Sequence, residues 1–148
     1  MRLLRSLATA ALLIAAVTSP VRSELVVFGD SLSDTGNLFF ATCGSDNPAG
    51  PFGPNGPFPT PPYFQGRHSN GPVFVEYLAE ALGASAAPGT TGGTNFAFGF
   101  AETGVGLSTQ GSPNVGAQID MFFGSGRTFS GSELVVLYAG ANDILFGG

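Results

Sequence analysis

The sequence contains no lysine, and only five arginines stand among its 148 residues. Three of those arginines lie within the first 22 positions, so only Arg67 and Arg127 remain beyond them, against ten aspartates and glutamates. Proteins that bind nucleic acid neutralise its phosphates with many lysine and arginine side chains. A chain with so little positive charge would be repelled by that polyanion, so a nucleic-acid partner is disfavoured.

Cysteine is almost as scarce as lysine. Cys43 is the only one, so no intrachain disulfide can form and packing must hold the domain together. There is one histidine, His68, and no pair of histidines or cysteines and no acidic loop has the spacing that metal ligands need. We therefore expect neither a metal site nor another cofactor.

Residues 1–23 have the composition of a secretory signal peptide. Arg2 and Arg5 give it a positive start, residues 7–17 are apolar, and Val21-Arg22-Ser23 suits a cleavage site. The apolar run is shorter than the ~20 residues of a membrane span, although an uncleaved N-terminal anchor is the alternative. The leader predicts a secreted or periplasmic protein with no stable membrane span after cleavage, in which residues 24–148 belong to one domain.

Two short apolar runs each lead into small polar residues. "LVVF" (25–28) precedes Gly-Asp-Ser, and "LVVLY" (134–138) precedes "AGAND" (139–143). Continuous apolar runs are typical of parallel strands that are covered on both faces. A third short strand is expected within "TNFAFGFAETG" (94–104). Strands separated by helices or long crossovers predict an α/β fold with a parallel sheet.

Two helices are expected between these strands. In the first, Ser69 or Asn70 would be the N-cap, Pro72 would lie in the first turn, and Gly83 would end the helix. Its apolar positions have helical spacing and are expected to face the core: Phe74, Tyr77, Leu78, Ala81 and Leu82. A second, weaker helix is expected over 115–123, with Asp120 in solvent.

A Gly/Pro-rich loop occupies residues 43–66 and contains several aromatic side chains. Loops of this length within a domain are often functional, although a solvated insertion is an equal alternative. The aromatics favour a segment that packs or contacts an apolar substrate. The candidates for that contact are Phe52, Phe58 and Phe64.

The ends of the expected strands carry groups suited to nucleophilic catalysis. Ligands of parallel sheets bind beyond the carboxyl ends of the strands, which here carry Ser31, Gly99 and Asn142. A serine needs a base to attack an ester, and it needs hydrogen-bond donors for the developing oxyanion. The alternative is that Asp30 and Ser31 cap the following turn and that Asn142 is a turn residue.

Four segments resemble the GDSL, or SGNH, hydrolases, a family of secreted lipases, esterases and acyltransferases. "FGDSLSDTGN" (28–37) resembles the first block of the family and "GRHSNGPVFVEYLAEALG" (66–83) the segment that follows it. "GTNFAFGFAETG" (93–104) and "GAND" (140–143) resemble the second and third blocks. The resemblance implies a flavodoxin-like, three-layer α/β/α fold that acts on an ester or lipid substrate.

The same resemblance implies roles for individual residues. Ser31 would be the nucleophile and also a backbone oxyanion donor, Asn142 would be a side-chain oxyanion donor, and Asp30 would shape the turn. The family usually has two glycines in its second block, where this chain has Gly99-Phe100. The third donor is therefore the backbone N–H of either Gly99 or Phe100, and Phe100 aligns better.

The general base of the family is a histidine in an Asp-x-x-His block near the C-terminus, and this sequence contains no such block. His68 lies where the family does not place its base, so a loop or helix-entry role is expected for it. The chain therefore resembles the N-terminal part of such an enzyme. Its sheet is expected to end at an unpaired edge. In "ILFGG" (144–148), Ile144, Leu145 and Phe146 are expected to lack partners.

Three functions fit these observations. The first is a GDSL-type esterase or lipase. The second is an acyltransferase of the same fold, because an alcohol and water attack an acyl-enzyme through the same residues. The third is a non-catalytic secreted protein that binds esters or lipids. The acyl chain, the alcohol and the oligomeric state have no signature in the sequence.

Overall fold

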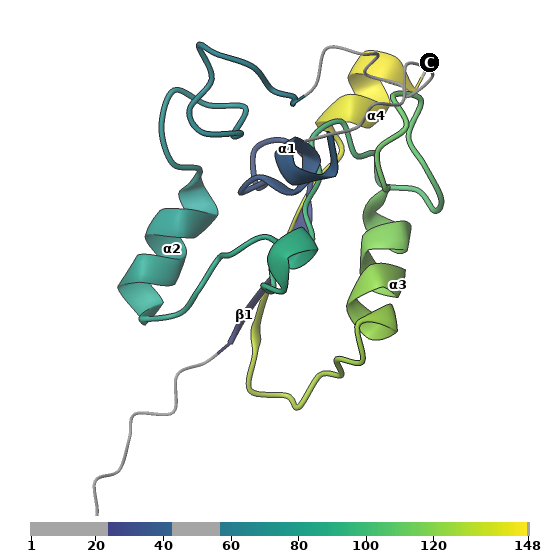
Figure 1. Cartoon of the computed structure of the whole chain (residues 1–148). Coiled ribbons are helices and arrows are strands. Elements are labelled where there is room, and N and C mark those ends of the chain that lie inside the picture. Colours follow the sequence, from purple (N-terminus) through teal and green to yellow (C-terminus); the bar gives the residue numbers. More distant parts are fainter. Residues whose placement is uncertain (1–23, 43–56, 148) are drawn as a thin grey trace, which may run out of the picture.

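The sheet is small and parallel. The computed structural model describes residues 24–42 and 57–147. In that part of the chain, strands β1 (Leu25–Gly29) and β2 (Leu134–Tyr138) pair in parallel, with Leu25 opposite Leu134 and Gly29 opposite Tyr138 (Figure 1). Both strands were expected at these positions. The expected signal peptide, Cys43 and Phe52 lie outside the described residues.

The third expected strand is an extended segment rather than a regular strand. Residues 94–98 follow the free edge of β1, where the Val27 N–H donates to the Thr94 carbonyl (3.1 Å) and the Phe96 N–H to the Val27 carbonyl (2.7 Å). The Phe98 N–H also donates to the Gly29 carbonyl (3.1 Å), but the Gly29 N–H donates to the Gln118 side chain (2.8 Å) and not to this segment. The regular ladder is therefore limited to one bridge, between Val27 and Asn95. β1 is therefore central, between this segment and β2.

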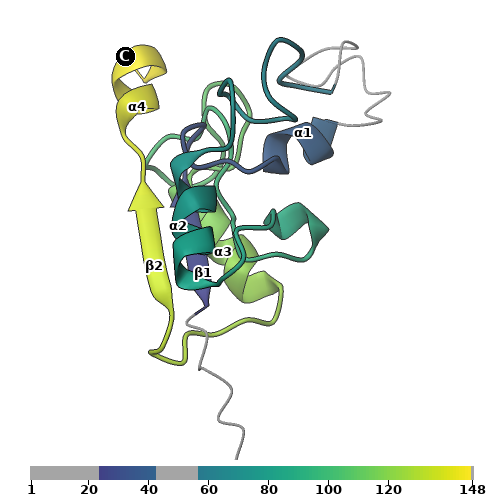
Figure 2. The same cartoon turned by 90° about the vertical axis from the view of Figure 1, so that its left-hand side faces the viewer.

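Helices cover both faces of β1. On one face Leu25 and Val27 join a core with Val75 and Ala79 of helix α2 (Phe74–Leu82). On the other face Val26 and Phe28 pack against Phe122 of helix α3 (Val115–Gly124). Figure 1 shows α2 and α3 on opposite sides of β1, and α2 lies in front of β1 in Figure 2. The expected α/β fold with a parallel sheet is thus confirmed, and β1 is covered on both faces.

The start and the buried face of α2 differ from the prediction. Its N-cap is Val73 rather than Ser69 or Asn70, and the Glu76 carboxylate accepts the Val73 N–H (2.8 Å). Val75 and Ala79 are buried, whereas Phe74 and Tyr77 are 45% and 58% exposed. The helix is apolar on two sides, so spacing alone could not identify the side that meets β1. Gly83 ends the helix at a φ of 62°, as expected.

β2 is much more exposed than its apolar sequence suggests. Leu134, Val135 and Leu137 are 41%, 46% and 57% exposed, because within the described residues β2 pairs only with β1. Ile144 in helix α4 (Ala141–Phe146) is 86% exposed. The expected unpaired edge is therefore present in the described part of the chain. Phe146 is the exception to the expectation for 144–148, because its ring lies 6.2 Å from that of Phe100.

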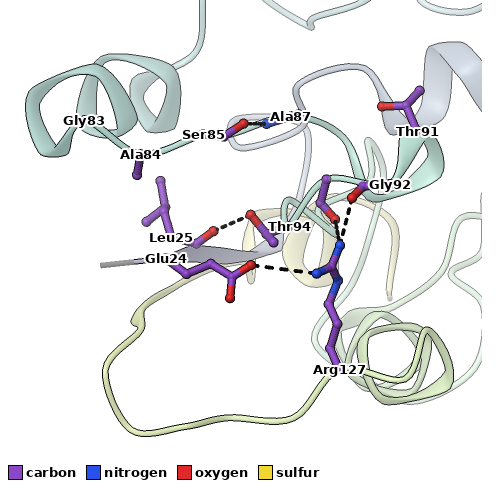
Figure 3. A pocket seen from close by; sticks show the side chains of 11 residues that line it. Glu24, Leu25, Gly83, Ala84, Ser85, Ala87, Thr91, Gly92, Thr94 and Arg127 are labelled. Carbon is purple, nitrogen blue, oxygen red and sulfur yellow. Dashed lines mark hydrogen bonds and ion pairs between the residues drawn. The ribbon is translucent and has the colours of Figure 1, made fainter. Parts of the chain in front are cut away.

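A charged contact lies at the opposite end of the sheet, where β1 begins. The Arg127 guanidinium donates to the Gly92 carbonyl (2.8 Å) and forms an ion pair with Glu24 (3.7 Å), at the entry to β1 (Figure 3). These residues line a cavity of about 700 Å³. Arg127 therefore joins the connection before β2 to the chain on the far side of β1.

The remaining elements are short. They are α1 (Asn37–Thr42), the 3₁₀ helix η2 (Gly89–Thr91) and α4. Among the residues that the structure describes, no helix combines the length and the apolar character needed to cross a membrane.

Candidate active site

Asp30 organises the turn that follows β1. Its Oδ1 accepts the Leu32 N–H (3.0 Å), and its carbonyl oxygen accepts the N–H groups of Ser33 and Asp34 (3.0 and 3.1 Å). Within the described part of the chain, Ser31 is the one residue of 31–34 whose N–H has no internal acceptor. Ser31 is half-buried. The turn thus presents an N–H and a hydroxyl on the same residue.

The turn begins at Gly29 because two other segments approach the backbone there. A Cβ at this position would lie in severe overlap with the Tyr138 carbonyl oxygen of β2. On the side of α3, the buried Gln118 side chain accepts the Gly29 N–H (2.8 Å) and donates to the Gly29 carbonyl (2.8 Å). Gln118 therefore fixes the end of β1 at the point where the chain turns toward Ser31.

A buried carboxylate connects this turn to a second segment of the site, the loop at Gly99. Asp34 is fully buried, and its two oxygens accept the N–H groups of Gly36 (2.8 Å), Asn37 (2.6 Å) and Leu38 (3.2 Å) at the start of α1. Asp34 Oδ2 also accepts the Gly99 N–H (2.9 Å). That N–H, one of the two backbone donors considered from the sequence, is therefore engaged within the protein.

Phe100, the other candidate donor, has a left-handed backbone with a φ of 67°. Side chains disfavour this conformation, which glycine adopts freely. Phe100 therefore has a backbone conformation typical of glycine, the residue that the resembled family usually has in this block.

Asn142 lies beside this loop. It is buried near the start of α4, and its Nδ2 donates to the Ala101 carbonyl (2.8 Å). The neighbouring Asp143 carboxylate accepts the N–H (3.1 Å) and the hydroxyl of Thr103. A side-chain amide has two N–H donors, so the contact with Ala101 orients Asn142 and leaves one donor for a ligand.

Two asparagines link α1 and the turn after β1 to the segment that lies beside β1. Asn37 Nδ2 donates to the carbonyls of Asn95 (2.7 Å) and Ala97 (2.9 Å), and Asn95 Nδ2 donates to the Ser33 carbonyl (2.7 Å). In Figures 1 and 2, α1, α4 and the loop after residue 98 gather at the end of the sheet to which β1 and β2 run. The three strand ends of the sequence prediction therefore form one hydrogen-bonded assembly.

His68 is packed as an aromatic ring. Its ring centre lies 5.3 Å from that of Phe100, 5.5 Å from Phe58 and 5.6 Å from Tyr63. Both ring nitrogens are buried without a hydrogen-bond partner in the described structure, and burial lowers the pKa of the imidazole. Within the described residues, no hydrogen bond joins His68 to Ser31.

Of the three aromatic residues expected to contact substrate, the structure describes two. Phe58 is half-buried and stacks on Phe100 at 5.7 Å, and Phe64 is half-buried with its N–H donated to the Ser69 carbonyl (2.9 Å). Phe52 lies outside the described residues. Phe58 is thus part of the packing behind the loop that contains Phe100.

A mostly apolar cavity of about 390 Å³ opens beside the turn. Its walls include Leu32, which directly follows Ser31, together with His68, Phe74 and Tyr138. The larger cavity at Arg127 lies at the opposite ends of the strands, away from every candidate residue. In the described residues, no cluster of histidine, cysteine, aspartate and glutamate side chains could hold a metal ion.

The residues that hold the site together were not predicted from the sequence: Asp34, Asn37, Asn95 and Gln118. A signal existed for Asp34, because an aspartate just before a helix often caps it, and Leu38, the first apolar residue of α1, follows it by four positions. Gln118 is the only polar side chain on the buried side of α3, but its partner is 89 positions away. Only the tertiary structure reveals such a contact.

Comparison with known proteins finds a matching family model and several similar proteins. The family model described as GDSL-like Lipase/Acylhydrolase matches residues 25–147. The chain is 35% identical to a phosphatidylcholine-sterol acyltransferase of Aeromonas hydrophila, over 88% of this chain and 36% of that protein. It is 36% identical to a GDSL esterase/lipase of Arabidopsis thaliana, over 68% of this chain and 25% of that protein. The chain thus spans about a third or less of the length of these relatives.

We predict that acidification stabilises the folded protein through Asp34. Burial, opposed by the four N–H donors, raises the pKa of Asp34 from 3.8 to about 6. The folded state therefore binds a proton more readily than the unfolded state, and the free energy of unfolding should rise by up to about 2 kcal/mol as the pH falls from 7 to 4.5. Urea unfolding at several pH values and a ¹³C NMR titration of the carboxyl group measure this.

Asp34→Asn should flatten that rise, whereas Asp120→Asn, on the exposed side of α3, should leave it unchanged. The pKa of Asp30 is also raised by burial, so a smaller rise should persist in Asp34→Asn. A carboxyl of Asp34 that titrates near 4, or a stability that falls between pH 7 and 5, would contradict the prediction.

Proposed function

The chain belongs to the GDSL-like lipase/acylhydrolase family, and on that premise we propose that it carries the nucleophile and oxyanion hole of a serine ester hydrolase. Ser31 is the proposed nucleophile. One observation carries the proposal: within the described residues, the assembly at the strand ends engages the neighbouring donors but leaves the Ser31 N–H and one N–H of Asn142 without an acceptor.

The proposed oxyanion hole has three donors. They are the N–H of Ser31, the second N–H of the Asn142 amide and the N–H of Phe100. Phe100 is preferred to Gly99 because the Gly99 N–H already donates to Asp34. Fixed donors of this kind stabilise the negative charge that develops on the carbonyl oxygen, and each is typically worth about 10²- to 10³-fold in rate.

The reaction follows from these roles. Ser31 Oγ attacks the carbonyl carbon of the ester and loses its proton to a general base, while the carbonyl oxygen accepts the three donors. The tetrahedral intermediate then collapses, and the base returns the proton to the departing alcohol. Water attacks the acyl-serine in the second half of the cycle and releases the acid.

The general base of this proposal is a histidine outside residues 24–147. His68 does not fill the role, because its nitrogens are buried in an aromatic cluster and it has no hydrogen bond to Ser31. We propose that a longer product of the same gene supplies the base from an Asp-x-x-His block. The greater length of the relatives supports this view.

Acyl transfer is the second candidate. It is favoured by the 35% identity to a phosphatidylcholine-sterol acyltransferase over 88% of the chain. The two activities differ only in whether water or an alcohol accepts the acyl group from Ser31. Incubation of the full-length protein with a phospholipid and a sterol distinguishes them: a sterol ester among the products indicates transfer, and free fatty acid alone indicates hydrolysis.

We further propose that the protein is exported and acts on an apolar substrate. The leader in residues 1–23 would direct the protein to the periplasm or the outside of the cell, where it would meet an ester or lipid. Phe52, Phe58 and Phe64 remain candidates for contact with the acyl chain, and the apolar cavity beside Leu32 is a further surface for it.

We predict that Ser31→Ala abolishes ester cleavage by the full-length protein, with a fall of about 10⁶-fold in kcat, because no other hydroxyl can form the acyl-enzyme. Ser33→Ala is the matched control. Ser33 belongs to the same turn, and its buried hydroxyl has no hydrogen-bond partner, so the control should remain within about 3-fold of the parent. Hydrolysis of a chromogenic short-chain ester measures both. Turnover retained by Ser31→Ala would remove Ser31 from the nucleophile role.

We predict that the reading frame continues past codon 148 and encodes an Asp-x-x-His motif. The base is needed because its loss typically costs about 10⁶-fold in turnover. Sequencing the genomic DNA or transcript beyond this codon decides the point. A stop codon directly after Gly148 would contradict the prediction and favour a protein that binds esters without cleaving them.

A further inference from the structure

Phe100 holds a backbone conformation that its own side chain disfavours. Its φ of 67° lies in the left-handed region, and Gln65 is the other non-glycine residue with a positive φ in the described chain. This conformation is unfavourable for a residue with a side chain and persists only where its surroundings enforce it. The conformation of Phe100 therefore depends on its neighbours.

Rings from three separate segments surround the Phe100 side chain. Phe58 stacks on it at 5.7 Å with an interplanar angle of 23°, and Phe146 of α4 lies edge-on at 6.2 Å. His68 meets it edge-on at 5.3 Å and 79°. Aromatic pairs at these separations contribute beyond the burial of their area, so rotation of the Phe100 ring out of this cluster would be unfavourable.

His68 occupies a special place in the cluster because it also touches the backbone just before Phe100. A Cβ on Gly99 would lie only 2.6 Å from His68 Cε1, so the imidazole lies directly against the Gly99 α-carbon. On the N-terminal side of the same residue, the Gly99 N–H is fixed by Asp34. Gly99 is therefore held by a carboxylate at its N–H and by a ring at its α-carbon.

We propose that His68 is a positioning residue, whose ring holds Phe100 in the left-handed conformation that turns its N–H toward the oxyanion. The inference rests on the proposed function for the meaning of that N–H, but the contacts of His68 with the Gly99 α-carbon and the Phe100 ring do not. The imidazole acts here through its shape. It exchanges no proton, in keeping with two buried nitrogens that have no partner.

The test is a double-mutant cycle in the full-length protein. His68→Ala should lower kcat about 10-fold or more, up to the 10²- to 10³-fold typical of a lost oxyanion donor, with KM changed less than about 3-fold. His68→Phe keeps the ring and should restore kcat to within about 3-fold of the parent. If His68→Ala is too unstable to purify, His68→Leu replaces it.

The second background is Phe100→Gly. Glycine reaches a positive φ without strain, so in this background His68→Ala should lower kcat by less than about 2-fold. Asn142→Ala is the comparison, because it removes a donor directly. Its effect on kcat should be similar with Phe100 and with Gly at position 100.

Two kinetic outcomes would overturn the proposal. An equal loss from His68→Ala in both backgrounds would mean that His68 supports the fold in general. A His68→Phe variant as inactive as His68→Ala would mean that the imidazole itself is needed.

A second measurement does not depend on catalysis. The backbone ¹³C and ¹⁵N chemical shifts of Phe100 report the sign of its φ, and we expect them to move toward negative φ in His68→Ala and to remain in His68→Phe. A Phe100 that stays left-handed in His68→Ala would overturn the positioning role. If the parent protein cleaves no ester, or Ser31→Ala cleaves it equally well, the proposed function fails while the NMR result still decides the role of His68.

Discussion

The buried carboxylate of Asp34 is the point at which the first turn, helix α1 and the Gly99 loop meet. Four backbone N–H groups converge on its two oxygens, three at the start of α1 and one from Gly99. Two of the chain segments that form the candidate site are thereby fixed by one side chain. Burying a carboxylate is costly unless its oxygens are satisfied, so the position of each of these N–H groups is tightly coupled to the others.

In the rest of the site, neutral amide side chains form hydrogen bonds with the backbone in the same way. Gln118 satisfies both backbone groups of Gly29, Asn95 and Asn37 join the first turn to the segment beside β1, and Asn142 reaches from α4 to the Ala101 carbonyl. The Gly29 N–H, which regular pairing would direct to the segment beside β1, is one of the groups satisfied in this way. Irregular backbone at the strand ends is thus satisfied by amides, whereas within the described residues the Ser31 N–H and one N–H of Asn142 have no internal acceptor.

Phe100 shows how the same site tolerates a departure from the family pattern. A glycine would adopt the required φ freely, whereas phenylalanine needs neighbours that compensate for the strain. Here the compensation comes from rings far apart in sequence, Phe58, His68 and Phe146. The aromatic loop, the helix-entry segment and α4 therefore all contribute to the shape of one peptide.

The sequence by itself determined β1, β2 and the approximate extent of α2 and α3, because apolar runs and turn-forming residues act locally. It also carried the family motifs, on which the roles proposed for Ser31 and Asn142 rest. The buried face of α2 was only partly right in the sequence prediction: Leu78 packs against the core as expected, but Phe74 and Tyr77 are exposed. That helix is apolar on two sides, and only contact with Leu25 and Val27 selects Val75 and Ala79. Phe100 already aligned better than Gly99 in the sequence, and the tertiary structure adds that Asp34, 65 positions away, accepts the Gly99 N–H. Local patterns fix what each segment can do, and long-range contacts decide which of its groups are left to do it.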